Sequence, residues 1–113
     1  MTDPEADDDA PLHLEHDLLI RMRLSNRALG VNAERVAIEE LADQLEAAVL
    51  EAGVGEYDGD EFGGGTCVLF FAGADADKLL AAMTPLLKRH PMGRSATVTI
   101  QRGSDAAPED VKF

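Results

Sequence analysis

The chain has 113 residues, of which 45 % are hydrophobic and only 4 % aromatic, so it is long enough for one domain with an aliphatic core. It holds 22 acidic and 10 basic residues, for a formal net charge of −12. Nucleic-acid phosphates and anionic membrane surfaces are bound by clustered Lys and Arg, so this charge disfavours both as partners. Cys67 is the one cysteine, which excludes an intramolecular disulfide and a cysteine metal cluster.

The first eleven residues, MTDPEADDDAP, contain five acids and no base. High charge and a lack of large apolar side chains predict a disordered acidic arm over residues 1–11. A secretion signal would place a basic region before an apolar run, and this start has neither. We therefore expect a cytoplasmic protein.

The segment HDLLIRMRL follows, and its apolar residues alternate in a period of two. Leu18, Ile20 and Met22 fall on one side, whereas Arg21 and Arg23 fall on the other, which predicts a strand with one buried face. Residues 33–52 repeat apolar side chains at helical spacing between Glu and Asp residues. This pattern predicts an amphipathic helix.

Two extended segments are expected next, over residues 55–62 and 66–73. The three glycines between them permit positive backbone angles and therefore a tight hairpin turn. The run TCVLFFA is apolar without interruption, which is typical of a strand inside a sheet rather than at its edge.

A second helix is predicted from Asp75, whose carboxylate suits the cap position. Pro85 lacks a backbone donor, so we expect it to kink or divide this helix. A last strand is predicted in SATVTIQR, residues 95–102, followed by a loose tail over residues 104–113. The expected domain spans residues 12–103.

The predicted order of elements is therefore β-α-β-β-α-β. With right-handed crossovers, this order predicts a ferredoxin-like α+β sandwich. Its antiparallel sheet would have four strands in the order 4-1-3-2, with both helices on one face.

The stretch GEYDGDEFGGGTCVLFFAGADADKLLAAMTPLL resembles a family of small bacterial proteins with no assigned activity. The shared pattern is Tyr-Asp-Gly, a glycine-rich turn, an apolar strand, and Gly-x-Asp-Ala-Asp-x-Leu before a helix that contains proline. The resemblance covers about a third of the chain and implies a ferredoxin-like fold but no reaction. The short piece EYDG is also similar to one in B-type regulators of ribonuclease E, which are acidic ferredoxin-like proteins. That similarity implies an acidic inhibitor.

The acidic stretch before the glycines raises the question of a metal or phosphate site. Read as a calcium loop from Asp58, it has Phe62 at the fifth position and Leu69 at the twelfth, so the EF-hand template fails. A phosphate loop needs Lys and Ser or Thr after the glycines, with a helix behind them, and these are missing. We therefore predict neither a metal nor a cofactor.

Electrostatic pairing offers another explanation of these acids. Arg21 and Arg23 would point to the helix-free face, and long side chains could reach carboxylates on the acidic strand. Alternation leaves open which set shares that face: Glu56, Asp58 and Asp60, or Tyr57 and Glu61.

The helix-free face of the sheet should be partly apolar. Either Val68 and Phe70, or Cys67, Leu69 and Phe71, must point away from the helices. A second copy of the chain is the commonest cover for such a face, so we expect a homodimer.

Two classes of function follow. The first is a non-enzymatic binding or regulatory module that acts through the open sheet face and the acidic strand. It could be an acidic inhibitor or immunity-type protein with a basic protein as partner. The alternative is a small dimeric ferredoxin-like enzyme that uses carboxylates between Glu56 and Glu61 with Arg21 or Arg23. No catalytic residue is assigned. The binding residues expected are Arg21, Arg23, Glu56, Tyr57, Asp58, Asp60, Glu61, Phe70 and Phe71.

Overall fold

A computed structural model describes residues 16–25, 32–103 and 106–112 of the chain. The predicted acidic arm, residues 1–11, lies outside this range. The elements are β1 His16–Arg23, α2 Asn32–Ala52, β2 Glu56–Gly63, β3 Thr66–Gly73, α3 Ala76–Arg89, α4 Pro91–Arg94, β4 Thr97–Arg102 and β5 Glu109–Lys112.

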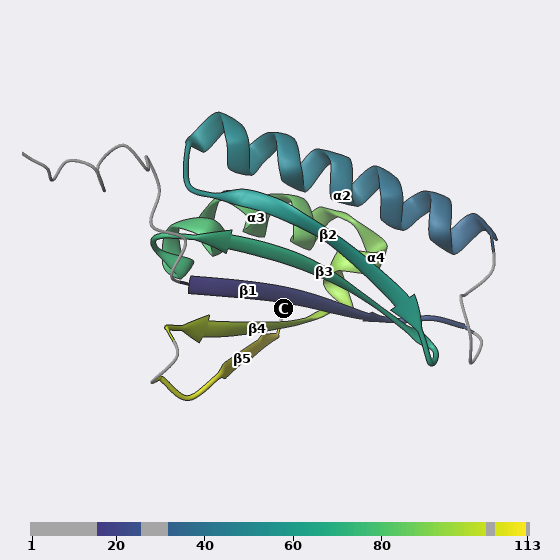
Figure 1. Cartoon of the computed structure of the whole chain (residues 1–113). Helices are drawn as coiled ribbons and strands as arrows, with labels where there is room; N and C mark the ends of the chain where they lie inside the picture. The colour runs from purple at the N-terminus through teal and green to yellow at the C-terminus, as the bar shows by residue number, and fades with distance from the viewer. Residues whose placement is uncertain (1–15, 26–31, 104–105, 113) are drawn as a thin grey trace, which may run out of the picture.

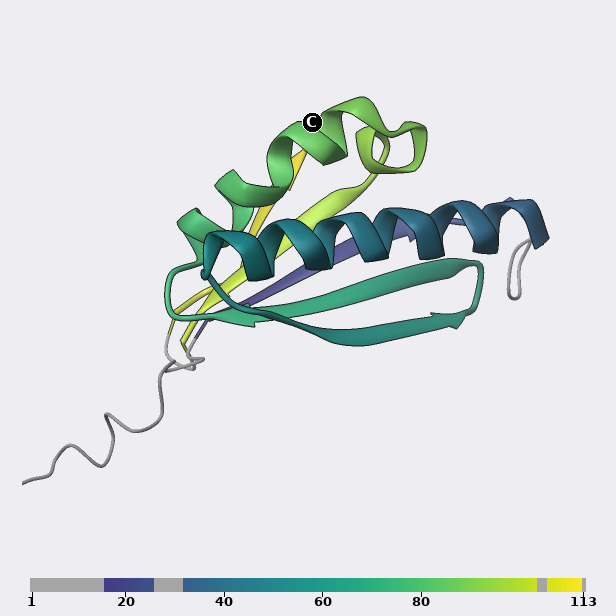
Figure 2. The same ribbon diagram turned by 90° about the horizontal axis from the view of Figure 1, so that it is seen from above.

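The strands form one antiparallel sheet in the order β2-β3-β1-β4-β5. The helices of the described residues, α2, α3 and α4, pack on the same side of the sheet, so this part of the chain has one helical layer and one β layer (Figures 1 and 2). No helix within the described residues is long and apolar enough to cross a membrane. The arrangement is an α+β fold in which no helix of the described residues covers the second face of the sheet.

The predicted four-stranded, two-helix ferredoxin-like sandwich is wrong. The sheet has five strands, because residues 109–112 of the expected loose tail pair with β4. Val111 of this strand packs against the core, which gives a polar segment one apolar anchor. The helical layer also has a third member, the short α4.

The core lies between the sheet and the helices. Alternate residues of β1, β3 and β4 enter it, and the apolar stripes of α2 and α3 close it from above. The largest fully buried side chains are Phe71, Leu18, Ile20, Met22, Ile38, Leu41, Leu45, Leu69, Leu79, Met83, Leu87 and Ile100. Burial of aliphatic side chains therefore supplies the main stabilisation, at about 25 cal/mol per Å² removed from water.

The hairpin between β2 and β3 turns at Gly64 and Gly65, as the glycine run predicts. Both have positive φ, 62° and 84°, which matches the two-residue hairpin turn that follows the twist of the strands. A second irregularity lies inside β2, where the pairing with β3 shifts between Tyr57 and Gly59. Gly59 has φ 116°, a conformation that only glycine adopts readily, so it permits this bulge.

Helix α3 begins as the sequence predicts but is not divided at Pro85. The carboxylate of Asp75 accepts hydrogen bonds from the backbone N–H of Asp77 and Lys78, at 2.9 and 3.3 Å. The helix continues through Pro85 to Arg89. Pro85 and Ala81, whose carbonyl loses its donor, are both exposed, so water can satisfy that carbonyl.

Candidate functional site

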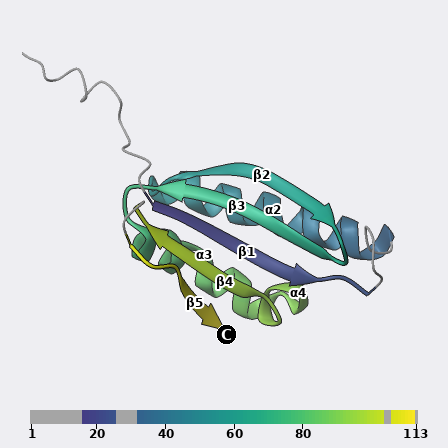
Figure 3. The same ribbon diagram turned by 60° about the horizontal axis from the view of Figure 1, so that its bottom comes forward.

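Figure 3 shows the face of the sheet on which no described helix lies. The side chains that alternate with the core residues point to this face. On β1 the core residues Leu18, Ile20 and Met22 are fully buried, so Leu19, Arg21 and Arg23 point to the opposite face. We call this helix-free surface the open face. Its rows follow from the strand register, because directly paired residues have side chains on the same side.

The centre of the open face is apolar. Leu19 of β1 pairs with Phe70 of β3, and Val68 pairs with Arg21 one step along. Leu19, Val68 and Phe70 are half-buried, and we call these three the apolar row. Phe71 points the other way: it is 1 % exposed, and its ring centroid lies 5.0 Å from that of Tyr57. The structure therefore assigns Phe70 to the surface and Phe71 to the core.

Beside the apolar row lies a basic depression of about 350 Å³. It is lined by Arg21, Arg23, Thr66, Ser95, Thr97 and Lys112. Arg21 pairs with Thr97 of β4, which in turn pairs with Lys112 of β5, so one row of the sheet carries two of the three cations. Arg23 follows Arg21 on the same side of β1. The lining contains no acidic residue.

Some polar groups of this depression already form hydrogen bonds within the chain, whereas its cations form no ion pair among the described residues. Thr66 donates its hydroxyl to the carbonyl of Gly63 at 3.2 Å, and Ser95 donates to the carbonyl of Met92 at 3.3 Å. The cations of Arg21, Arg23 and Lys112 take part in neither of the two ion pairs formed among the described residues. They are therefore available to a group that comes from outside.

The acids of β2 do not share one face. The bulge resets the alternation, so Glu56 and Glu61 are in register with open-face residues, whereas Tyr57 and Asp60 are in register with the core residues Phe71 and Leu69. Asp58 is skipped in the pairing. Neither set foreseen from simple alternation is thus correct.

The pKa values of Glu56 and Tyr57 on β2 are both raised by their surroundings. A hydrogen bond with Asp58 is the main cause that raises the pKa of Glu56 above its ordinary value. Burial raises the pKa of Tyr57, with a further contribution from the Asp60 carboxylate. The Tyr57 hydroxyl lies 3.3 Å from Asp60 Oδ2 and donates to it. Tyr57 is therefore half-buried, with its ring beside Phe71 and its hydroxyl bonded to Asp60.

The expected pairing of Arg21 and Arg23 with the β2 acids is wrong for the described residues. The acids lie on β2, which β3 separates from β1. The two ion pairs formed among the described residues both belong to Arg102. The described residues also contain no group of three His, Cys, Asp or Glu side chains placed to hold a metal ion.

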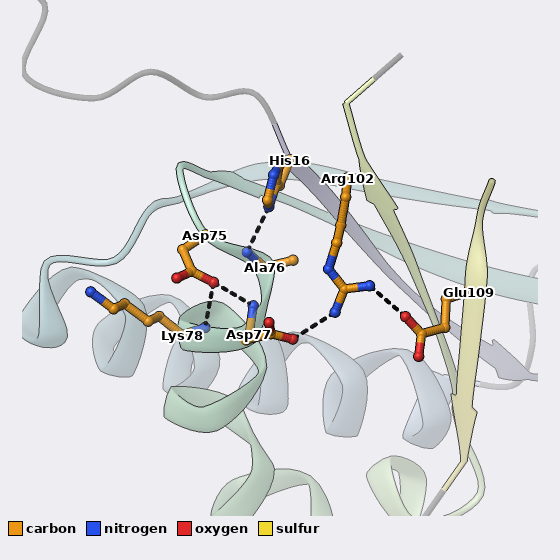
Figure 4. Close-up of polar contacts among 7 residues, drawn as sticks. All are labelled: His16, Asp75, Ala76, Asp77, Lys78, Arg102 and Glu109. Carbon is orange, nitrogen blue, oxygen red and sulfur yellow. Dashed lines mark hydrogen bonds and ion pairs between the residues drawn. The ribbon is translucent and has the colours of Figure 1, made fainter. Parts of the chain in front are cut away.

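Arg102 is a polar centre that sequence reasoning missed (Figure 4). Its guanidinium lies 2.6 Å from Asp77 at the start of α3 and also pairs with Glu109 at the start of β5. Nearby, His16 Nδ1 accepts a hydrogen bond from the backbone N–H of Ala76 at 2.9 Å. These contacts tie the ends of β1, α3, β4 and β5 together. The sequence after Gly103 lacks the alternation that predicts a strand, so the contact between Arg102 and Glu109 could not be foreseen.

Cys67 is fully buried and in the core, as its place on an apolar strand suggests. Burial raises the pKa of its thiol to about 12, so the reactive thiolate is disfavoured at neutral pH. It is a small packed residue.

No family model matches the chain, and no curated protein sequence matches it. Among solved structures, the chain is similar to Rv0793 from Mycobacterium tuberculosis, with a TM-score of 0.56 and 18 % identity over 81 % of this chain and 97 % of that one. It is also similar to a phage SAM lyase in the apo state, with a TM-score of 0.47 and 13 % identity, covering 88 % and 90 % of the two chains. The likeness to Rv0793 shows a shared fold and assigns no ligand or reaction.

Proposed function

We propose that the chain is a non-enzymatic binding module that works through the open face, and that two copies associate there. The observation that carries this proposal is the apolar row of Leu19, Val68 and Phe70 on a sheet face without helices. Apolar side chains at the centre of an uncovered sheet are usually buried by another surface.

The size of the open face sets the expected strength of the association. Three strands of eight residues, one of six and one of four give roughly 500 Å² from strand spacing and rise. A standard specific interface buries about 800 Å² per partner, so this face lies at the small end. The dimer should therefore be weak and should dissociate on dilution.

Charge is arranged around the apolar row in a way that suits a two-fold interface. Glu56 and Glu61 stand on one side of the row, on β2. Arg21 and Lys112 stand toward the other side, on β1 and β5, together with Asp110, whose carboxylate accepts a hydrogen bond from Thr99. A two-fold axis through the row would surround it with a polar rim, and neither like charges nor a buried charge would need to meet at the centre.

The enzyme alternative gains no support from the site geometry. The depression that holds Arg21 and Arg23 is lined by no carboxylate, and β3 separates it from β2.

An acidic inhibitor is a second form of the binding proposal. It is favoured by four exposed carboxylates on the edge strand β2: Glu56, Asp58, Asp60 and Glu61. The same acids, with the bulge, would also keep this edge from pairing with other strands.

Phe70→Glu tests the self-association directly. The change puts an unpaired charge into the middle of the apolar row, where burial would be costly. We expect the native chain to sediment as a dimer at high micromolar concentration and Phe70→Glu to sediment as a monomer with native circular dichroism.

Leu50→Glu is the matched control, because Leu50 is a 59 % exposed apolar residue on α2. It should leave the dimer unchanged. A native chain that is monomeric at high micromolar concentration would contradict the proposal. Dissociation by Leu50→Glu instead of Phe70→Glu would place the interface on the helical layer.

A further inference from the structure

The basic depression has an unusual composition for so acidic a chain. Three of the ten basic residues line it, together with three hydroxyl residues and no acid, although the chain has 22 acidic residues. Two of these cations, Arg21 and Arg23, are next-but-one neighbours on β1 and point the same way. Like charges held this close repel, and no carboxylate of the described residues forms an ion pair with either arginine.

The geometry points to a binding site for a small organic anion in this depression, with a phosphate or carboxylate group held by Arg21, Arg23 and Lys112. Guanidinium groups donate two parallel hydrogen bonds to such oxyanions, and the ammonium of Lys112 adds a third positive charge. Thr97 lies between Arg21 and Lys112 in the same row, so its hydroxyl can donate to the same anion.

The dimensions favour a ligand larger than a bare ion. Small-molecule sites commonly enclose about 300 to 1,000 Å³, and the depression has about 350 Å³. Val68 pairs directly with Arg21 across the two strands. Leu19 is two residues from Arg21 on β1, and Phe70 pairs with Leu19. An anion with an apolar or aromatic body could thus place its charge on the cations and its body on the apolar row.

This site is separate from the proposed self-association. The depression is lined by residues of one chain, from β1, β3, β4 and β5 and from Ser95 before β4. If two copies do meet through the apolar row, the anion would lie at the rim of their interface.

The test is a titration followed by NMR shifts of the backbone amides, with phenyl phosphate, benzoate, inorganic phosphate and neutral benzyl alcohol as probes. We expect saturable shifts at Arg21, Arg23, Thr97 and Lys112 with the aromatic anions. Inorganic phosphate should bind the same residues more weakly, and benzyl alcohol should not bind. The stronger of phenyl phosphate and benzoate identifies the anionic group.

Arg21→Gln and Arg23→Gln should each weaken binding by about tenfold, the usual effect of losing a hydrogen bond to a charged group. Lys88→Gln removes one positive charge from the exposed end of α3 and is the matched control. Its affinity should equal that of the native chain. Equal losses in all three variants, or shifts spread over all surface cations, would show general charge attraction and overturn the proposal.

The titration should be run at two protein concentrations, one of them low enough for sedimentation to show only monomer. Binding at both concentrations supports the site whether or not the dimer exists. Binding only to the dilute monomer would support the site and show that the partner chain covers it in the dimer. Binding at neither concentration would overturn the small-anion assignment.

Discussion

Glu56 and Asp58 show how a single residue pair sets a pH response. The raised pKa of Glu56 means that the native state holds this proton more readily than the unfolded chain does. The native state is thus favoured by this group below the unfolded pKa of Glu56, and the advantage is lost as pH rises through the higher native value. Above that native value the negative charge of Glu56 lies beside the Asp58 side chain, which is a small unfavourable contact on an exposed strand.

Glu56→Gln should therefore raise the melting temperature slightly at neutral pH, because it removes a charge beside Asp58. The difference from the native chain should shrink as the pH falls and Glu56 becomes protonated in both states. Glu51→Gln, on the exposed side of α2, makes the same charge change far from Asp58 and controls for net charge. A gain for Glu56→Gln that is as large at acidic as at neutral pH would contradict this explanation.

At the scale of elements, two glycines differ sharply in what surrounds them. A Cβ added at Gly73, the last residue of β3, would lie 2.3 Å from the carbonyl oxygen of Val54 and 3.1 Å from Leu79 Cδ1. A Cβ added at Gly63, the last residue of β2, would meet nothing within 4 Å. Gly73 thus lets the end of β3 pack against the chain that enters β2.

Gly73→Ala should lower the free energy of unfolding by about 1–3 kcal/mol, the usual cost of forcing atoms into a packed site. Gly63→Ala should stay within about 0.5 kcal/mol of the native chain, as surface changes normally do. Urea denaturation of both variants checks this difference. Equal stability of the two would contradict the close packing at Gly73.

The helices and strands also differ in whether a local sequence pattern predicts them. The alternation in β1, the stripe of α2, the glycine hairpin and the Asp75 cap are local signals, and the elements form where these signals lie. Strand β5 has only four residues and one apolar anchor, Val111, so its pairing depends on β4 rather than on its own pattern. Missing it made the predicted fold wrong.

The candidate site was only partly predictable for a related reason. Arg21 and Arg23 could be placed on the open face from their alternation on β1. Thr97 joins them through the β1–β4 pairing, which the predicted strand order also contains. Lys112 joins them through the β4–β5 pairing, which no local pattern reveals. The sides taken by the β2 acids depend on the bulge at Gly59, and a period of two cannot describe a strand that contains one.

At the scale of the whole molecule, two surfaces could bury apolar side chains against another chain. One is the open face, with the apolar row of Leu19, Val68 and Phe70. The other is the outer side of α2, where Val36 is 46 % exposed and Leu50 is 59 % exposed. The two α2 residues stand fourteen positions apart and form no continuous patch with each other, whereas the apolar row is contiguous across β1 and β3.

The central claim is that the open face is the working surface, and backbone amide NMR on dilution tests it most directly. Spectra recorded from high micromolar concentration downward should shift at residues of the apolar row and at Arg21, while the amides of α2 stay fixed. Shifts centred on Val36 and Leu50 would assign the interface to the helical layer. Spectra that do not change with concentration would contradict self-association through either surface.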